Sequence, residues 1–187
     1  MLAMQGAFAE HIGVLRQAGG DALPVRLPGD LEGLDGLVIP GGESTTISRL
    51  MREYGLVQPV RDMAQQGLPL LGICAGLVLL ASEVGDPRVE PLALMDIGVK
   101  RNAFGRQVDS FETDLDMPVL GEAPFRAIFI RAPIVERAGP EVDVLARLDD
   151  GTVVAVRQGK LLAAAFHPEL TGDLRFHRYF LDLAGSA

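Results

Sequence analysis

The sequence predicts a three-layer α/β fold, in which a mostly parallel central sheet carries helices on both faces and continues into an antiparallel extension. In the first half, short apolar runs such as GLVIP (36–40) and LPLLGI (68–73) alternate with segments of helical periodicity. Strands that alternate with helices usually pair in parallel through crossover connections. In the second half, turn signals separate β-rich runs directly, which is typical of antiparallel hairpins.

The chain begins with a short predicted strand at residues 2–4 and a helix. Phe8, Ile12 and Leu15 fall on one helical face, and Gly19–Gly20 would end that helix. The segment ALPVRL (22–27) is a second predicted strand, and its proline suits a sheet edge better than a centre.

The buried run GLVIP (36–40) predicts a third strand, and a helix follows it. Ser44, Thr45 and Thr46 are candidate N-caps for this helix. Its predicted apolar face consists of Ile47, Leu50, Met51 and Tyr54. A further helix at about 56–66 leads into a fourth strand, PLLGI (69–73), and then into a helix after Cys74.

Antiparallel strands are predicted over 142–166, with turns at Asp150–Gly151 and Gln158–Gly159. The last predicted helix covers about 172–184. Its apolar positions would include Leu174, Tyr179, Leu181 and Leu183.

The composition predicts one domain, 1–187, and excludes several classes of function. A hydrophobic content of 48% and a mean hydropathy of +0.24 indicate a large core. The net charge of −8, without a basic block, argues against a nucleic acid partner. No apolar run approaches the ~20 residues of a membrane span, and the N-terminus does not resemble a signal peptide. One cysteine and three histidines predict no zinc cluster, and an unpaired thiol suggests the cytoplasm.

Cys74 lies between two glycines in GICAGL (72–77), at the end of an apolar strand. This pattern has the form of a nucleophile elbow, which exposes the side chain and turns the N–H of Ala75 toward the space above it. A helix that begins there also favours a thiolate. The alternative is a small buried hydrophobe, and the pattern alone does not decide between the two.

His167 and Glu169 in FHPEL (166–170) support the elbow. Pro168 is predicted to keep the backbone extended, so that both side chains point the same way. A carboxylate that orients an imidazole, which in turn takes a proton from a thiol, is the arrangement of a catalytic triad. Alone, the triplet would be an ordinary surface histidine beside an unrelated glutamate; together with the elbow, the triad is favoured.

The segment PGGESTT (40–46) follows the third strand. Two adjacent glycines allow backbone amides to turn toward a substrate oxygen, as an oxyanion hole requires. The same residues could form only a tight turn before a capped helix, and both interpretations are compatible.

The three motifs together resemble those of class I, triad-type glutamine amidotransferases, which have a flavodoxin-like α/β fold. The specific resemblance is to the glutaminase subunits of pyridoxal 5′-phosphate synthases, and it runs almost end to end. It is carried by QGAFAEH (5–11), IPGGESTTI (39–47), RNAFGRQVDSFE (101–112), FIRAP (129–133) and FHPELT (166–171).

The resemblance implies a role for each matching residue. Cys74 would attack the side-chain carboxamide of L-glutamine, His167 would act as base and then acid, and Glu169 would orient His167. The backbone amides of Gly42 and Ala75 would bind the oxyanion. Contacts to glutamine are implied for Gly41, Gly42, Glu43, Arg101, Ile130 and Arg131. Asn102, Gly105, Arg106 and Gln107 would position the Arg101 loop, whereas His11 and His177 are interpreted as surface or packing residues away from the triad.

The resemblance also implies a partner. Ammonia would pass to a synthase (lyase) subunit in a hetero-oligomer, with no cofactor or metal in the glutaminase itself, and residues 5–20 with the rim of the PGGES turn would dock that subunit. Two alternatives remain: another enzyme with an elbow cysteine, such as a peptidase-like or glyoxalase-like protein, and a docking subunit without turnover. The first strand is shorter than is usual in the family, which bears on stability and docking but not on the triad.

Overall fold

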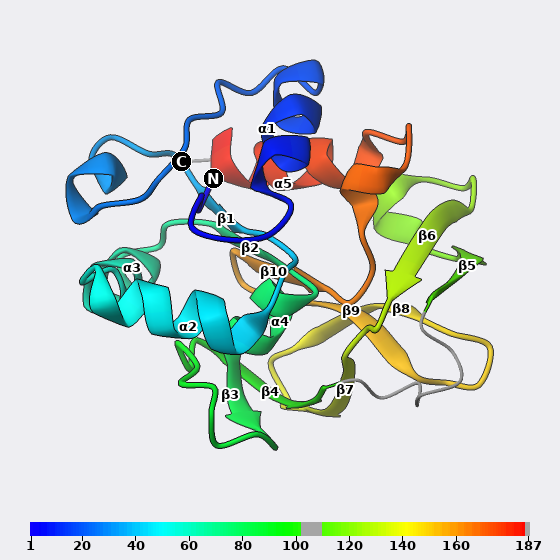
Figure 1. Ribbon diagram of the computed structural model, residues 1–187. Helices are drawn as coiled ribbons and strands as arrows, with labels where there is room; N and C mark the ends of the chain where they lie inside the picture. Colours follow the sequence, from blue (N-terminus) through cyan, green and yellow to red (C-terminus); the bar gives the residue numbers. More distant parts are fainter. Residues whose placement is uncertain (102–109, 186–187) are drawn as a thin grey trace.

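The computed structural model describes residues 1–101 and 110–185, and within them a mixed sheet of eight strands forms the centre of the fold (Figure 1). Seven strands follow one another across it in the order β1 (Leu37–Ile39), β2 (Leu70–Ile73), β10 (Leu161–Ala164), β9 (Val153–Gln158), β7 (Ile134–Ala138), β4 (Met95–Lys100) and β3 (Ala81–Val84). The eighth strand, β8 (Asp143–Arg147), pairs with β9. A separate ribbon contains β5 (Ser110–Leu115) and β6 (Phe125–Ile130).

The direction of pairing changes across the sheet. Strands β1, β2 and β10 are parallel, and so are β3 and β4, whereas the other neighbours are antiparallel. The α/β class and the antiparallel extension are therefore confirmed, but the sheet is mixed rather than mostly parallel. The hairpin between β9 and β10 explains much of this, since its turn at Gly159, with a φ of +59°, returns the chain directly beside the strand that it has just left.

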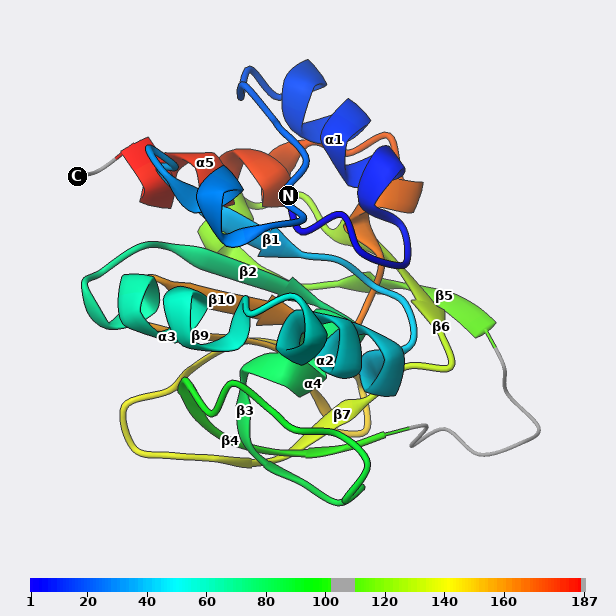
Figure 2. The ribbon, with the colours of Figure 1, turned by 60° about the vertical axis from the view of Figure 1, so that its left-hand side comes forward.

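Helices cover both faces of the sheet, as predicted (Figure 2). One face carries α1 (Phe8–Gln17) and α5 (Arg175–Gly185). The other carries α2 (Ser44–Glu53), α3 (Val57–Gln65) and α4 (Ala75–Leu80). Short 3₁₀ turns lie at η1 (Pro28–Leu31), η2 (Pro118–Leu120) and η3 (Pro168–Leu170). No helix in 1–101 or 110–185 is long and apolar enough to cross a membrane.

The short first strand is present as little more than a bridge. Leu2 pairs in parallel with Val25, and its N–H donates to the carbonyl of Val38 in β1 at 2.8 Å. The first residues are thus inserted between β1 and the segment around Val25. The strand predicted over 22–27 is wrong, because Val25 alone makes a bridge there. Leu2 and Val25 are both fully buried.

Two predicted features of α2 are wrong. Its N-cap is Glu43, whose carboxylate accepts from the N–H groups of Thr45 and Thr46, rather than one of the hydroxyl residues that follow. Tyr54 is 50% exposed, because the helix buries a narrower face than predicted. The buried residues of α2 are Ser44, Ile47, Ser48 and Met51.

The predicted apolar face of α5 is also wrong. The helix buries Phe176, His177, Phe180 and Ala184. Phe176 packs against Phe125 of β6 and against Phe166, with ring centroids 6.1 Å and 5.4 Å apart. Aromatic partners from distant segments therefore determine which face of α5 turns inward.

The strands from Ala81 to Ala138 are the main elements that the sequence patterns do not predict. They are short, and in β5 only Leu115 is buried, so the period of apolar residues is weak there. Residues 102–109 lie outside the described part of the chain, and with them the predicted positioning residues Asn102, Gly105, Arg106 and Gln107.

Candidate active site

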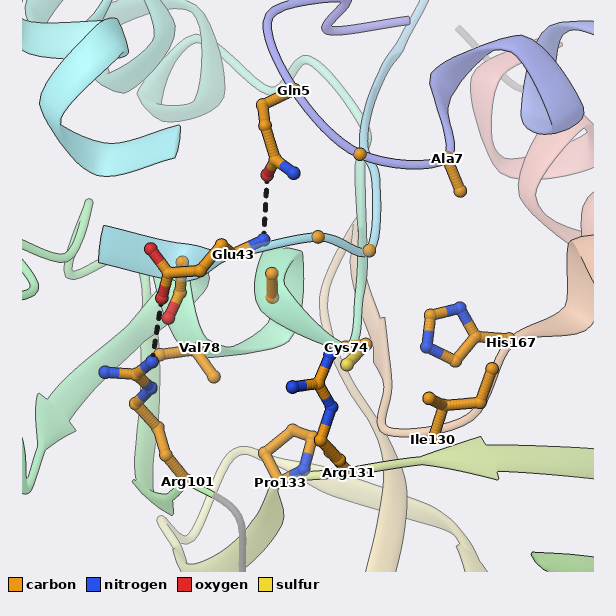
Figure 3. A pocket seen from close by; sticks show the side chains of 15 residues that line it. Gln5, Ala7, Glu43, Cys74, Val78, Arg101, Ile130, Arg131, Pro133 and His167 are labelled. Carbon is orange, nitrogen blue, oxygen red and sulfur yellow. Dashed lines mark hydrogen bonds and ion pairs between the residues drawn. The ribbon is translucent and has the colours of Figure 1, made fainter. Parts of the chain in front are cut away.

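The carboxyl ends of the parallel strands β1, β2 and β10 meet at one edge of the sheet, where a cleft of about 420 Å³ opens (Figure 3). Ligands of open α/β sheets bind at this edge. All but one of the residues that the sequence predicts for the site line this cleft. They are Gly41, Gly42, Glu43, Cys74, Ala75, Arg101, Ile130, Arg131 and His167. The exception is Glu169, which is buried behind His167.

Cys74 occupies the sharp turn that the sequence predicts between β2 and α4. Its φ of 50° and ψ of −96° are strained for a residue with a side chain. Its N–H donates to the carbonyl of Ala164 at 2.7 Å, which ties the turn to β10. A Cβ at Gly76 would lie 2.2 Å from the carbonyl oxygen of Ile39, so α4 can approach β1 only without one. The thiol is 9% exposed and faces the cleft.

His167 and Glu169 meet as predicted, although by a different backbone path. The Nδ1 of His167 lies 2.7 Å from Oε1 of Glu169. The extended backbone predicted between them is wrong, because Pro168 starts the 3₁₀ turn η3 and Glu169 belongs to that turn. The turn, rather than an extended strand, brings the carboxylate to Nδ1 of the ring.

The imidazole of His167 is held in its charged form. Burial alone would lower its pKa, but the interactions with Cys74 and Glu169 outweigh burial and raise the pKa of His167 to about 10. Burial would raise the pKa of Glu169, yet the hydrogen bond to His167 lowers it on balance. The side chains therefore favour an imidazolium between a carboxylate and the thiol, in a ring that lines the cleft.

The interpretation of His11 and His177 as residues away from the triad is wrong. Both are fully buried, and Nε2 of His11 lies 3.2 Å from Oε2 of Glu169. Nδ1 of His11 lies 3.1 Å from Nε2 of His177. His11 lies in QGAFAEH (5–11), far from FHPEL (166–170) in the sequence, so no local spacing could indicate its contact with Glu169.

The loop that would supply an oxyanion donor is held by the segment before α1. The N–H of Ala7 donates to the carbonyl of Gly41 at 3.0 Å, and the N–H of Glu43 donates to Oε1 of Gln5 at 2.8 Å. A Cβ at Gly6 would lie 1.9 Å from the Gly41 oxygen, so only glycine allows this approach. The motif QGAFAEH contains Gln5 and Ala7, but the sequence assigns no site role to either.

Glu43 and Arg101 are already paired with each other. Besides capping α2, the Glu43 carboxylate lies 3.0 Å from the Arg101 guanidinium (Figure 3). Burial opposes ionisation of Glu43, but hydrogen bonds from Thr45 and Thr46 lower its pKa to about 2. Arg101 also forms an ion pair with Asp86, a neighbour that the sequence does not predict. Both predicted contacts to glutamine therefore have protein partners in this structure.

Arg131 differs from Arg101 in its surroundings. It follows β6 with a φ of 42°, and its side chain reaches toward Cys74 across the floor of the cleft (Figure 3). Within the described residues it forms no ion pair.

In that same part of the chain, no group of three or more histidine, cysteine, aspartate or glutamate side chains is arranged to hold a metal ion.

Comparison with known proteins assigns the chain to a family. The model of the SNO glutamine amidotransferase family matches residues 1–185. The chain belongs to this family. It is 58% identical over 186 residues to the pyridoxal 5′-phosphate synthase subunit PdxT of Herpetosiphon aurantiacus, covering 98% of each chain. It is 59% identical to the PdxT of Pelotomaculum thermopropionicum, covering 97% of this chain and 92% of that protein.

Solved structures agree with the family assignment. A crystal structure described as a glutamine amidotransferase is 52% identical and superimposes with a TM-score of 0.93 over 98% of this chain and 97% of its own. PurLQS from Thermotoga maritima, at 16% identity and a TM-score of 0.69 over 99% and 95%, shares the fold. The class of protein that the sequence motifs indicate, a glutamine amidotransferase, is thereby confirmed.

Proposed function

We propose that this chain is the glutaminase subunit of a pyridoxal 5′-phosphate synthase. It hydrolyses L-glutamine to L-glutamate and ammonia, and the ammonia passes to a synthase subunit in a hetero-oligomer. The names and full-length similarity of the PdxT relatives support the assembly. The observation that carries the chemistry is the meeting of Cys74, His167 and Glu169 at the edge of the cleft. An unpaired nucleophilic thiol is also consistent with a cytoplasmic location, which we propose as well.

In the proposed reaction, the Cys74 thiolate attacks the carboxamide carbon of glutamine. The imidazolium of His167 gives a proton to the departing ammonia, and a glutamyl thioester remains on Cys74. Neutral His167 then takes a proton from water, whose oxygen attacks the thioester and releases glutamate. Glu169 holds Nδ1 of His167, so Nε2 is the nitrogen that exchanges protons in both halves of the reaction.

The oxyanion of each tetrahedral intermediate would lie between two backbone N–H groups. Ala75 begins α4 directly after the nucleophile, so its N–H is at the positive end of the helix. The carbonyl of Gly41 is bound by Ala7, and in a trans peptide the N–H of Gly42 points the opposite way. These two N–H groups are the proposed oxyanion donors.

The α-carboxylate of glutamine needs a cation, and we propose Arg131 as its main partner. Its guanidinium is in the cleft without an ion pair to a described residue, whereas Arg101 is engaged by Glu43 and Asp86. Arg101 would then act by holding Glu43 at the rim. Gly41 and Ile130 complete the cleft walls around the substrate.

The test is glutamate formation from L-glutamine, with and without the synthase subunit of the same organism, for the wild type and Cys74→Ala. We expect turnover that depends on the synthase subunit and falls by at least 10³-fold in Cys74→Ala. Equal turnover in both proteins would show that Cys74 is not the nucleophile. Binding of the synthase subunit without turnover in any mixture would favour the docking-only alternative, and consumption of methylglyoxal in place of glutamine would favour a glyoxalase-like enzyme.

A further inference from the structure

The three histidines of the chain and Glu169 form one connected series of contacts. His11 comes from α1, His177 from α5 and His167 from the segment after β10, and each is at most 8% exposed. Glu169, which is 6% exposed, lies between His167 and His11, and His177 contacts the far side of His11. Histidine is normally only partly buried, so three buried histidines linked to one acid require an explanation. The proposed reaction uses only His167.

The distances determine which nitrogen carries a proton. A carboxylate can only accept, so His11 must present its protonated Nε2 to Oε2 of Glu169, 3.2 Å away. In a neutral ring Nδ1 is then unprotonated, and it accepts from Nε2–H of His177 at 3.1 Å. The contact to Glu169 is close but not aligned as a hydrogen bond. The carboxylate facing Nε2 favours this tautomer of His11, and the contact with His177 is compatible with it because His177 can donate its own Nε2–H.

The rings of His11 and His177 are both neutral at neutral pH. Burial lowers the pKa of His11 to about 4 against the attraction of Glu169 and Glu10, with His167 and the amino terminus lowering it further. Burial and the neighbouring His11 lower the pKa of His177 to about 4. Because His11 is uncharged, it can orient Glu169 while the negative charge of the carboxylate remains paired with the His167 imidazolium.

The carboxylate needs such a partner on its second oxygen. Oε1 of Glu169 is bound by His167, but Oε2 has no exposed surface and would otherwise be a buried anionic oxygen without a donor. Glu169 also belongs to a 3₁₀ turn of three residues, which constrains its side chain less than a long helix would. His11 from α1 is the group that lies within 3.2 Å of this second oxygen.

We propose that His11, in its Nε2–H tautomer, is a positioning residue that holds Glu169 in the orientation in which it supports His167. The activity arm of the test rests on the proposed glutaminase function, whereas the spectroscopic arm does not. His11 does not line the cleft, so it contacts neither glutamine nor the thiol.

The spectroscopic test uses the full chain labelled with ¹⁵N in its histidine rings. Three histidines give three sets of ring signals, which histidine-to-glutamine variants assign. We expect His11 and His177 as neutral Nε2–H tautomers from pH 8 down to about pH 5, and His167 as imidazolium at neutral pH. An Nδ1–H tautomer for His11, or titration of His11 near pH 6.5 as for an exposed ring, would overturn the proposal whether or not glutamine is hydrolysed.

Two variants of His11 compare loss of the N–H donor that faces Glu169 with retention of such a donor. His11→Leu removes the donor to Glu169, and we expect kcat in the complex with the synthase subunit to fall about tenfold or more, with KM nearly unchanged. The His167 ring should then titrate at a lower pH. His11→Gln keeps an N–H donor at a similar reach and should restore part of kcat and part of the His167 titration shift.

Val60→Ala is the control. Val60 is also a buried helical residue, at 0% exposure on α3, but it lies outside the histidine cluster, the cleft and the predicted docking segment. The substitution should lower stability without changing kcat or the titration of His167. If His11→Leu behaves like Val60→Ala, or if His11→Gln restores nothing, His11 serves packing alone and the proposal is wrong. A wild-type complex that hydrolyses no glutamine would refute the proposed function, while the ring spectra would still decide the role of His11.

Discussion

Gly41 stands directly against the catalytic ring. A Cβ at this position would lie 2.5 Å from Cε1 and 3.1 Å from Nδ1 of His167, although its φ is not in the left-handed region. The glycine is therefore required by the imidazole and not by backbone conformation. Any side chain at position 41 must displace the ring from Glu169, from the thiol, or from both.

We expect Gly41→Ala to lower kcat by about 10²-fold, because a shift of about 1 Å in a catalytic group is enough for such a loss. The measurement is glutamine hydrolysis by the complex, with the free energy of unfolding followed separately. Gly29→Ala is the control: position 29 lies in η1, its φ is not in the left-handed region, and nothing lies within 4 Å of the added Cβ. That change should leave kcat unaltered. A Gly41→Ala enzyme with normal kcat would show that the loop yields without moving the ring.

Apolar side chains lie on more than one face of α5. The aromatic cluster of Phe125, Phe166 and Phe176 determines which of these faces is buried. Phe176 is fully buried between Phe125 and Phe166, whereas Leu174 precedes the helix and is only partly buried. The same cluster brings β6 against the end of β10, next to His167. Packing of α5 thus helps to place the catalytic segment.

Phe176→Ala should lower the free energy of unfolding by about 3–5 kcal/mol, because it leaves a cavity among rings that cannot close over it. Leu174→Ala should cost about 1 kcal/mol or less, since its side chain is already partly in water. Urea denaturation of both variants distinguishes the observed face from the predicted one. Equal losses would mean that the cluster relaxes around the missing ring.

At the N-terminus of α2, as on the buried face of α5, contacts from distant segments decide a local feature. Three consecutive hydroxyl residues are suitable caps, but Glu43 precedes them and accepts from the N–H groups of Thr45 and Thr46. Its backbone N–H is in turn held by Gln5. A tertiary contact from the start of the chain therefore sets where α2 begins, which in turn sets the position of the glycine loop.

The buried histidines make the stability of the fold depend on pH. The pKa values of His11 and His177 are lowered to about 4 from an ordinary 6.5, so between these values the folded protein binds fewer protons than the unfolded chain. The free energy of unfolding must then fall as the pH drops through this window. The full effect is on the order of 3 kcal/mol per ring, since one pKa unit corresponds to about 1.4 kcal/mol.

We expect urea denaturation to show this loss between pH 6.5 and 4, and a His11→Gln, His177→Gln double variant to show a flatter acid limb. His167 works in the opposite direction, because its pKa is raised to about 10. Its stabilisation is complete below pH 6.5 and declines as the pH rises toward 10, so His167→Gln should flatten the alkaline limb alone. An acid limb that is equally steep with and without His11 and His177 would contradict the assignment.

Local patterns were sufficient to predict the strand–turn–helix units of the first half and the hairpins near the end. The turn at Cys74 and the glycines after β1 were predictable too, because each depends on residues adjacent in the chain. The short strands β3, β5 and β7 were not, because each of them has only one buried side chain.

The motifs were sufficient to predict Cys74, His167 and Glu169 as site residues, because each role requires a particular side chain in a particular local turn. What surrounds them depends on contacts between segments far apart in the sequence. His11 and His177 are 166 positions apart, and Asp86 and Arg101 join loops from different strands. The histidine contact follows from packing α1 and α5 on one face of the sheet, and the ion pair follows from the pairing of β3 with β4. Both depend on how separate segments pack together, which no single segment contains.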